Sequence, residues 1–256
     1  MSLNPKIADW AGQRVWVIGA STGIGAAVAR ELINRRARVA LSARTRERLD
    51  AIAKGNDAVV APLDVTDVAS VRAAAAAVLS ALGHLDLVIV VAGTHSPMRA
   101  DRFDLARADQ LLAVNLHGPL HCLDAVLPTL LAQGRGGIAL VASVAGYRGL
   151  PQALIYGASK AALIHLAEGL YLDLHPRGLG VYLVNPGFVD TPLTQRNKFA
   201  MPALMTAEKA ARRTLEGIAA GRFEIHYPRR FTSWLKLLRL LPYSAYFAAV
   251  RRFTGG

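Results

Sequence analysis

A tyrosine and a lysine stand four residues apart at Tyr156 and Lys160, in a segment of helical composition. Four residues is about one helical turn, so both side chains lie on one face. A phenol, with a pKa of about 10, is a poor acid at neutral pH, and a nearby ammonium group lowers that pKa by stabilising the phenolate. Ser143 ends a predicted strand and can hydrogen-bond a substrate oxygen. Together the three side chains suit proton exchange coupled to hydride transfer.

A glycine-rich turn near the start of the chain suits the phosphates of a nucleotide. Gly19, Gly23 and Gly25 stand between an apolar strand predicted at 14–19 and a helix predicted at 26–33. Glycines permit a tight turn and a close approach of the backbone to a phosphate, and the helix N-terminus supplies free N–H groups. The spacing is G-x-x-x-G-x-G, which differs from the common dinucleotide pattern G-x-G-x-x-G. The turn nevertheless predicts a pyrophosphate site.

The residues after the second predicted strand, at 38–42, bear on which nucleotide binds. An acidic side chain there would bind a ribose 2′-hydroxyl and repel a 2′-phosphate. This chain has Ala43 at that place, then Arg44, with Arg46 and Arg48 following. A guanidinium group suits a phosphate dianion. We therefore expect NADP(H) as the preferred cofactor, with NAD(H) left open. The alternative is that Arg44 is only a solvated loop charge.

The elements that must position these residues alternate along the chain. Apolar strands are predicted at 14–19, 38–42, 58–64, 85–91, 137–143 and 180–185, and helices at 26–33, 45–53, 68–82, 107–131 and 156–174. Strands that are apolar throughout and alternate with helices indicate a parallel sheet covered on both faces. Ligands of such sheets bind beyond the carboxyl ends of the strands. The expected fold is α/β, a Rossmann-like doubly wound parallel sheet in three α/β/α layers, forming a single domain.

With these motifs in this order, the chain resembles a classical short-chain dehydrogenase/reductase over about residues 10–222. Beyond the residues above, the matching features are Asp64-Val65, Asn115, Asn185-Pro186-Gly187 and Thr191. The resemblance implies that Tyr156 is the catalytic acid/base, that Ser143 orients the carbonyl, and that Lys160 supports both the tyrosine and the ribose. It also implies that Asn115 bends its helix and holds a water in a proton relay.

The same resemblance implies a set of cofactor contacts, with Asp64 and Val65 at the adenine and Val189 and Thr191 around the carboxamide. The full expected set is Gly19, Ser21, Thr22, Gly23, Ile24, Gly25, Arg44, Asp64, Val65, Ala92, Gly93, Tyr156, Lys160, Pro186, Gly187, Val189 and Thr191. The chain departs from the family at Val90-Val91-Ala92-Gly93, where Asn-Asn-Ala-Gly is usual, and this bears on the stability of the central sheet. Ser21 and Thr22 replace the basic residue of many NADP-preferring members, so the cofactor prediction rests almost entirely on Arg44.

A largely apolar stretch at about 188–206 matches the family's substrate lid. Its apolar residues are Phe188, Leu193, Phe199, Met201, Leu204 and Met205. They favour a hydrophobic carbonyl or alcohol substrate, although packing the lid down would explain them equally well. Arg196 and Lys198 could meet an anionic group. The resemblance also implies a homodimer or homotetramer.

The net charge is +12, and half of it lies in residues 225–256, which hold six Lys or Arg and no Asp or Glu. Within this segment Trp234, Leu237, Leu238 and Leu241 recur at helical spacing in a helix predicted at 233–242. We assign 1–222 to the Rossmann-like domain and 223–256 to a C-terminal extension. A basic amphipathic helix suits an anionic membrane surface. The alternative is that the extension folds over the substrate pocket or a neighbouring subunit.

Two function classes remain. One is an NADP(H)-dependent oxidoreductase; the alternative is a non-catalytic Rossmann protein whose basic surface binds nucleic acid or a membrane. No RNA-binding motif is visible, so we expect no nucleic acid partner. The single Cys122 excludes an internal disulfide, and His117 and His121 have no third ligand at suitable spacing, so we expect no metal. No signal peptide is visible, and we expect a cytoplasmic protein, with peripheral membrane contact through the extension as a further option.

Overall fold

The computed structural model describes residues 2–196 and 201–254. Within these ranges seven parallel strands form one sheet in the order β3-β2-β1-β4-β5-β6-β9. Their bounds are β1 (Arg14–Ile18), β2 (Arg38–Ser42), β3 (Val59–Val60), β4 (Leu87–Val90), β5 (Gly137–Val141), β6 (Gly180–Pro186) and β9 (Glu224–Tyr227). The strand order reverses between β1 and β4, and ligands of doubly wound sheets bind beside such a reversal.

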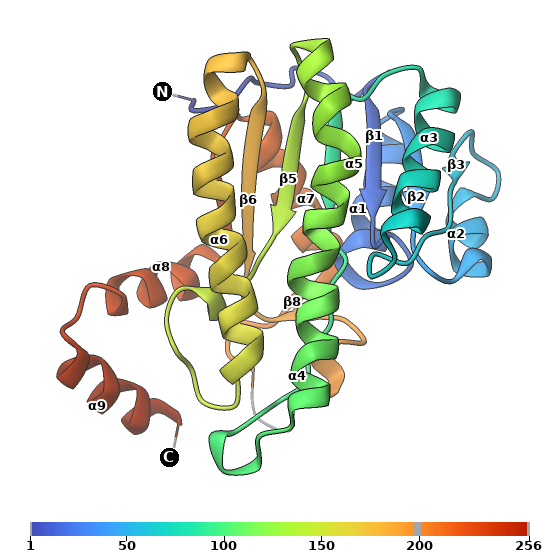
Figure 1. The fold of residues 1–256 in the computed structure, drawn as a ribbon. Coiled ribbons are helices and arrows are strands. Elements are labelled where there is room, and N and C mark those ends of the chain that lie inside the picture. The colour runs from blue at the N-terminus through green and yellow to red at the C-terminus, as the bar shows by residue number, and fades with distance from the viewer. Residues whose placement is uncertain (1, 197–200, 255–256) are drawn as a thin grey trace.

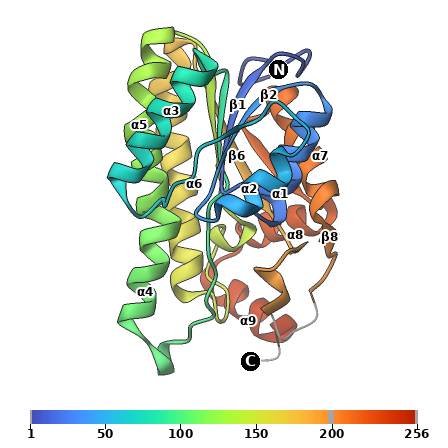
Figure 2. The same cartoon turned by 90° about the vertical axis from the view of Figure 1, so that its right-hand side faces the viewer.

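Helices cover both faces of the sheet (Figure 1, Figure 2). One face carries α1 (Gly23–Asn34), α2 (Arg46–Ala53) and α7 (Ala207–Ala219), and the other carries α3 (Val68–Leu82), α4 (Leu105–Leu112), α5 (Gly118–Gln133) and α6 (Leu154–Leu174). Successive strand residues point to opposite faces. In β4, for example, Val88 joins the core cluster under α3, α5 and α6, and Ile89 joins the cluster under α1 and α7. The predicted three-layer doubly wound fold is confirmed.

The sheet contains a strand that the sequence analysis did not predict. β9 pairs with β6 along Leu183–Pro186 and lies inside the segment assigned to the extension. Its four residues alternate between half-buried and buried positions, which is too short a pattern to stand out in a sequence. β3, in contrast, is shorter than the predicted 58–64, although Ala61 and Leu63 still donate backbone hydrogen bonds to Leu41 and Ala43. The extension therefore begins with part of the sheet.

The long helix predicted at 107–131 is interrupted in the structure. α4 ends at Leu112, the π-helical turn Ala113–His117 follows, and α5 continues to Gln133. A π-helical turn holds an extra residue and shifts the direction in which the following side chains point. The interruption surrounds Asn115, whose side chain is completely buried.

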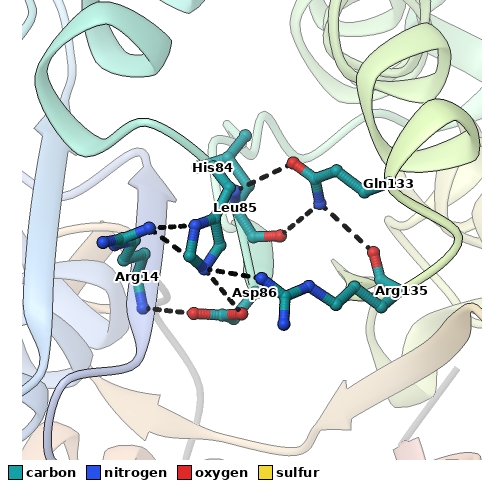
Figure 3. Close-up of polar contacts among 6 residues, drawn as sticks. All are labelled: Arg14, His84, Leu85, Asp86, Gln133 and Arg135. Atoms are coloured by element: carbon teal, nitrogen blue, oxygen red, sulfur yellow. Dashed lines mark hydrogen bonds and ion pairs between the residues drawn. The ribbon is translucent and has the colours of Figure 1, made fainter.

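A polar cluster holds the amino ends of the central strands, at the edge away from the predicted site (Figure 3). Arg14 donates its backbone N–H to Asp86 Oδ2 at 2.8 Å, and its guanidinium group contacts the His84 ring. Gln133, at the end of α5, accepts from the Leu85 N–H at 3.1 Å and donates to the Leu85 carbonyl at 2.8 Å. These contacts fix the segment that enters β4 between β1 and α5.

Two helices follow β9, α8 (Arg229–Leu238) and α9 (Tyr243–Thr254), and they form an angled pair at the carboxyl end of the sheet (Figure 1). α8 begins earlier than the predicted Ser233. The predicted single apolar stripe was wrong, because Leu238 is 8% exposed and faces the body, whereas Trp234 and Leu237 are 49% and 54% exposed. None of the helices in the described ranges is long and apolar enough to span a bilayer.

Candidate active site

The structure brings the predicted serine, tyrosine and lysine together at the carboxyl end of β5. Ser143 follows β5 by two residues, and α6 carries Tyr156 and Lys160 one turn apart. Lys160 is 4% exposed, and its Nζ donates to the carbonyl oxygen of Val141 at 3.0 Å. The same Nζ lies 5.9 Å from the centre of the Tyr156 ring. β5 and α6 thus bring the three side chains together, with Ser143 and Lys160 buried and Tyr156 half-buried.

Burial governs the ionisation of these groups. It raises the pKa of Tyr156, and a hydrogen bond with Ser143 lowers it only in part. Burial also lowers the pKa of Lys160, to about 8. The net shift of the Tyr156 pKa in this structure is therefore upward, not downward as expected, because the loss of solvent around the phenol has the largest effect. At neutral pH Tyr156 is a protonated phenol, which is the form that can donate a proton to a substrate oxygen.

His95, which was not among the predicted site residues, packs against Tyr156. The ring centroids are 4.7 Å apart and the planes meet at 86°, an edge-to-face contact. Burial lowers the pKa of His95, so the imidazole is neutral at neutral pH. No motif marks this residue in the sequence; its one signal is its place two residues after Gly93, in the loop that leaves β4.

Asn115 holds that same loop against α6. Its Oδ1 accepts from the backbone N–H of Thr94 at 2.7 Å, and its Nδ2 donates to the Thr94 carbonyl at 2.9 Å and to Ser159 Oγ at 3.3 Å. A Cβ added at Gly93 would lie 3.5 Å from both Asn115 Oδ1 and Lys160 Nζ. The π-helical turn therefore places Asn115 where the β4 loop and the lysine meet.

The glycine turn is packed too closely for larger residues at two of its positions. A Cβ at Gly19, where φ is +98°, would lie 2.5 Å from the backbone nitrogen of Ala92. A Cβ at Gly25 would lie 2.1 Å from the carbonyl oxygen of Gly19. At Gly23 the nearest neighbour is Thr191 Cγ2, at 3.0 Å. The turn therefore folds back on the exit of β4 and meets the predicted carboxamide segment.

The start of α1 fits a cofactor diphosphate. Thr22 is the N-cap of α1, and its side chain makes no capping hydrogen bond, so the first N–H groups of α1, beginning with those of Gly23 and Ile24, remain available to an anion. A cavity at this point is lined by residues that include Ser21, Thr22, Gly23, Arg30 and Thr191. These donors and the positive helix terminus suit the phosphates of a nicotinamide dinucleotide.

The residues predicted to contact the adenine end of the cofactor follow β2 and β3. Thr66 donates its backbone N–H to Asp64 Oδ1 at 2.9 Å, and this hydrogen bond, with the charge of Arg44, holds the pKa of Asp64 below its usual value. Arg44 is exposed. The neighbouring Val65 offers its carbonyl oxygen to His121 Nδ1, 2.8 Å away. Among the described residues, no three His, Cys, Asp or Glu side chains are grouped as metal ligands.

The lid is tied down at both of its described ends. Pro186 ends β6, and the Gly187 N–H donates to the Tyr227 carbonyl at 2.8 Å. Val189 pairs with Met205 in a small parallel sheet of β7 (Val189–Asp190) and β8 (Met205–Thr206). Phe188 packs against Phe231 of α8 at 5.8 Å between ring centroids. Lys198, Phe199 and the side chain of Arg196 lie outside the described part of the chain.

Comparisons with known proteins agree with this arrangement. A family model described as short chain dehydrogenase matches residues 13–201. An uncharacterized oxidoreductase of Myxococcus xanthus is 34% identical over 251 residues, which cover 96% of this chain and 99% of that protein. A short chain dehydrogenase from Burkholderia cenocepacia, solved with NADP, is 27% identical with a TM-score of 0.84, over 94% of this chain and 98% of its own. A mutant short-chain dehydrogenase/reductase from Serratia marcescens is 26% identical with a TM-score of 0.75, over 85% and 97%.

Proposed function

Because the chain belongs to the short-chain dehydrogenase family of oxidoreductases, we propose that it interconverts a hydrophobic carbonyl compound and its secondary alcohol with NADP(H). The observation that carries the proposal is the group of Ser143, Tyr156 and Lys160 beside a glycine turn that fits a dinucleotide. A protein that only bound nucleic acid or a membrane would need neither a buried lysine nor a half-buried, hydrogen-bonded phenol at this place.

The proposed mechanism assigns one task to each side chain. A nicotinamide dinucleotide held at the glycine turn and the start of α1 would supply or accept the hydride. Tyr156 donates its proton to the carbonyl oxygen, and Ser143 hydrogen-bonds the same oxygen and so holds the carbonyl in place. The charge of Lys160 stabilises the phenolate that remains on Tyr156. Asn115 acts as a positioning residue, because it fixes the β4 loop beside the lysine.

The assignment of Tyr156 is tested by Tyr156→Phe, which removes only the hydroxyl group. We expect turnover to fall by about 100-fold or more on any ketone or aldehyde that the wild type accepts with NADPH. Binding of NADPH, measured by fluorescence titration, should stay within a few-fold. Tyr171→Phe is the matched control, because Tyr171 lies on the same helix and its hydroxyl bonds only the Leu3 carbonyl among the described contacts. Near wild-type turnover in Tyr156→Phe would refute the assignment.

We propose NADP(H) rather than NAD(H) because Arg44 offers an exposed guanidinium group beyond β2 with Ala43 in the usual acidic position. The relative from Burkholderia cenocepacia, solved with NADP, supports the choice. We expect Arg44→Ala to weaken NADPH binding about tenfold to a hundredfold, the effect of losing a charged hydrogen bond, and to leave NADH binding unchanged. Arg72→Ala, which removes an exposed arginine on α3, is the control. Equal affinity of the wild type for NADH and NADPH would contradict the proposal.

The apolar lid supports the hydrophobic substrate class. Phe188 and Phe231 form an aromatic contact at its base, and His95 lines the Tyr156 ring with a neutral imidazole. A series of ketones of increasing chain length should show kcat/KM rising with apolar surface. We further propose that the protein is a cytoplasmic homodimer or homotetramer.

A further inference from the structure

The outer sides of α8 and α9 carry a row of exposed apolar side chains. Its members, which we call the outer row, are Trp234, Leu237, Leu240, Tyr243 and Phe247, with exposed fractions of 49%, 54%, 81%, 71% and 50%. They recur every three or four residues from α8 through the turn into α9. Exposed apolar side chains that gather on one element, rather than scatter singly, mark an interaction surface.

The opposite sides of the two helices are fixed to the body, so the outer row has a defined orientation. Leu238 of α8 and Tyr246 of α9 are 8% and 2% exposed. Arg148 donates to the carbonyl oxygens of Leu238 and Leu241 at 3.2 and 2.7 Å, and the Tyr246 hydroxyl donates to the Gly149 carbonyl at 2.7 Å. Leu238 and Tyr246 thus pack inward, whereas the outer row is exposed.

The charged side chains that α8, α9 and the turn between them contribute are all cations. Residues 225–256 contain no Asp or Glu. Five arginines of α8, α9 and the intervening turn are exposed, namely Arg229, Arg230, Arg239, Arg251 and Arg252. Two copies of this surface would repel each other, because each would bring only cations to a symmetric contact. A surface that has anionic groups above an apolar layer can bind both the exposed arginines and the apolar outer row.

We propose that α8 and α9 bind the surface of an anionic lipid bilayer. The outer row enters the boundary between headgroups and acyl chains, and the arginines meet the lipid phosphates. Trp234 and Tyr243 suit this depth, since their rings are apolar and each carries one polar group. The α8–α9 pair lies at the carboxyl end of the sheet, the same end as the candidate active site (Figure 1).

The first test is co-sedimentation of the full chain with vesicles of phosphatidylcholine alone or mixed with phosphatidylglycerol. We expect binding to the mixed vesicles at low salt, weaker binding at high salt, and little binding to phosphatidylcholine alone. Leu237→Glu should weaken the binding by about tenfold or more, because it loses an apolar contact and adds an anion. Leu3→Glu is the matched control: Leu3 has the same residue type, is 52% exposed, and lies near the N-terminus at the opposite end of the molecule (Figure 1, Figure 2).

The second test uses the tryptophans as a depth probe. The chain has three, and Trp10 and Trp16 are 4% and 0% exposed. Quenching by brominated acyl chains in the mixed vesicles should therefore report Trp234, and Trp234→Phe should abolish the quenching while sedimentation persists. Absence of quenching, binding independent of anionic lipid, or equal binding by Leu237→Glu and Leu3→Glu would overturn the proposal. So would a fall in oligomeric mass in Leu237→Glu without vesicle binding, since that outcome assigns the outer row to a second copy of the chain.

Discussion

Lys160 carries its ammonium group in a space where only one neighbouring oxygen, the carbonyl of Val141, is within hydrogen-bonding distance among the described contacts. Desolvation therefore lowers its pKa to about 8 from 10.5. The pKa of the neighbouring Tyr156 is instead raised by desolvation. Both shifts favour the uncharged form, so in this structure the pair tends toward a neutral phenol and an ammonium group that is close to losing its proton.

This shift predicts a pH dependence of stability. Below pH 8 Lys160 is protonated in both the folded and the unfolded chain, and the buried charge costs free energy. Between pH 8 and 10.5 the unfolded chain holds more protons, so stability rises with pH, and above 10.5 the cost is gone. In urea unfolding of the cofactor-free protein, wild type should gain up to about 3 kcal/mol relative to Lys160→Met across that window. Parallel pH curves for the two proteins would contradict the shift.

The spacing of Tyr156 and Lys160 was visible in the sequence because a helix turns every 3.6 residues. Their proton affinities were not visible, because enclosure by β5, the β4 loop and α6 depends on contacts between distant segments. His95 was missed for the same reason: nothing in its local sequence indicates that its ring meets Tyr156.

Two sets of side-chain contacts connect α8 and α9 to the elements that carry the candidate site, and Glu224 makes the first set. Glu224 on β9 accepts from the Tyr147 hydroxyl at 2.5 Å and from Asn185 Nδ2 at 2.9 Å, and it pairs with Lys236 of α8. Burial would raise the pKa of Glu224, but the hydrogen bonds from these three partners outweigh it, and the pKa is lowered. One carboxylate thereby joins β6, β9, α8 and the segment after Ser143.

Arg148 supplies the second connection, and its loss should be measurable. Arg148→Ala removes the hydrogen bonds to the end of α8 and the contacts of the guanidinium group with the Tyr243 and Tyr246 rings, at 4.7 and 4.1 Å. We expect the free energy of unfolding to fall by about 2–3 kcal/mol and α9 to become sensitive to limited proteolysis. Arg72→Ala, which breaks an exposed ion pair, should cost less than about 1 kcal/mol. Equal losses in the two variants would show that the α8 and α9 contacts contribute little.

Helices and strands whose apolar residues repeat at a regular period were predicted well. Those whose bounds or buried side depend on tertiary contacts were not. The helix at Val68–Leu82 has the predicted bounds, because its apolar residues repeat regularly and Asp67 caps its start. β9 was missed because four residues give no clear period and its partner β6 lies far away in sequence. The apolar stripe of α8 was misassigned, because spacing alone does not say which of two apolar sides faces the body.

At the scale of the whole molecule, a second set of exposed apolar side chains lies on the α4–α6 side of the sheet. Its main members are Phe103, Leu105, Leu120, Leu154 and Leu172, with exposed fractions between 40% and 72%. Phe103 precedes α4, and the other four lie on α4, α5 and α6, which flank the sheet. We propose that these side chains form the contact between copies of the chain.

Light scattering at micromolar concentration should therefore give a mass of at least twice the chain mass of 27.3 kDa. Leu172→Glu, at a position 72% exposed, should lower that mass, because an anion in an apolar contact is costly to desolvate. Leu204→Glu changes an equally apolar side chain, 48% exposed, on the lid and should not. A wild-type protein that is monomeric under these conditions would refute this interpretation.

Arg148 lies between Ser143 and Tyr156 in the sequence. Its guanidinium group contacts the end of α8 and the Tyr246 ring of α9. If a bound substrate restrains the segment that carries Ser143, the contacts of Arg148 would connect that restraint to α8 and α9. Linkage makes such an effect reciprocal: if a bilayer raises the affinity for substrate by some factor, substrate raises the affinity for the bilayer by the same factor. A soluble substrate added to a vesicle suspension would then pull the enzyme from solution onto the lipid, and Arg148→Ala would uncouple the two equilibria.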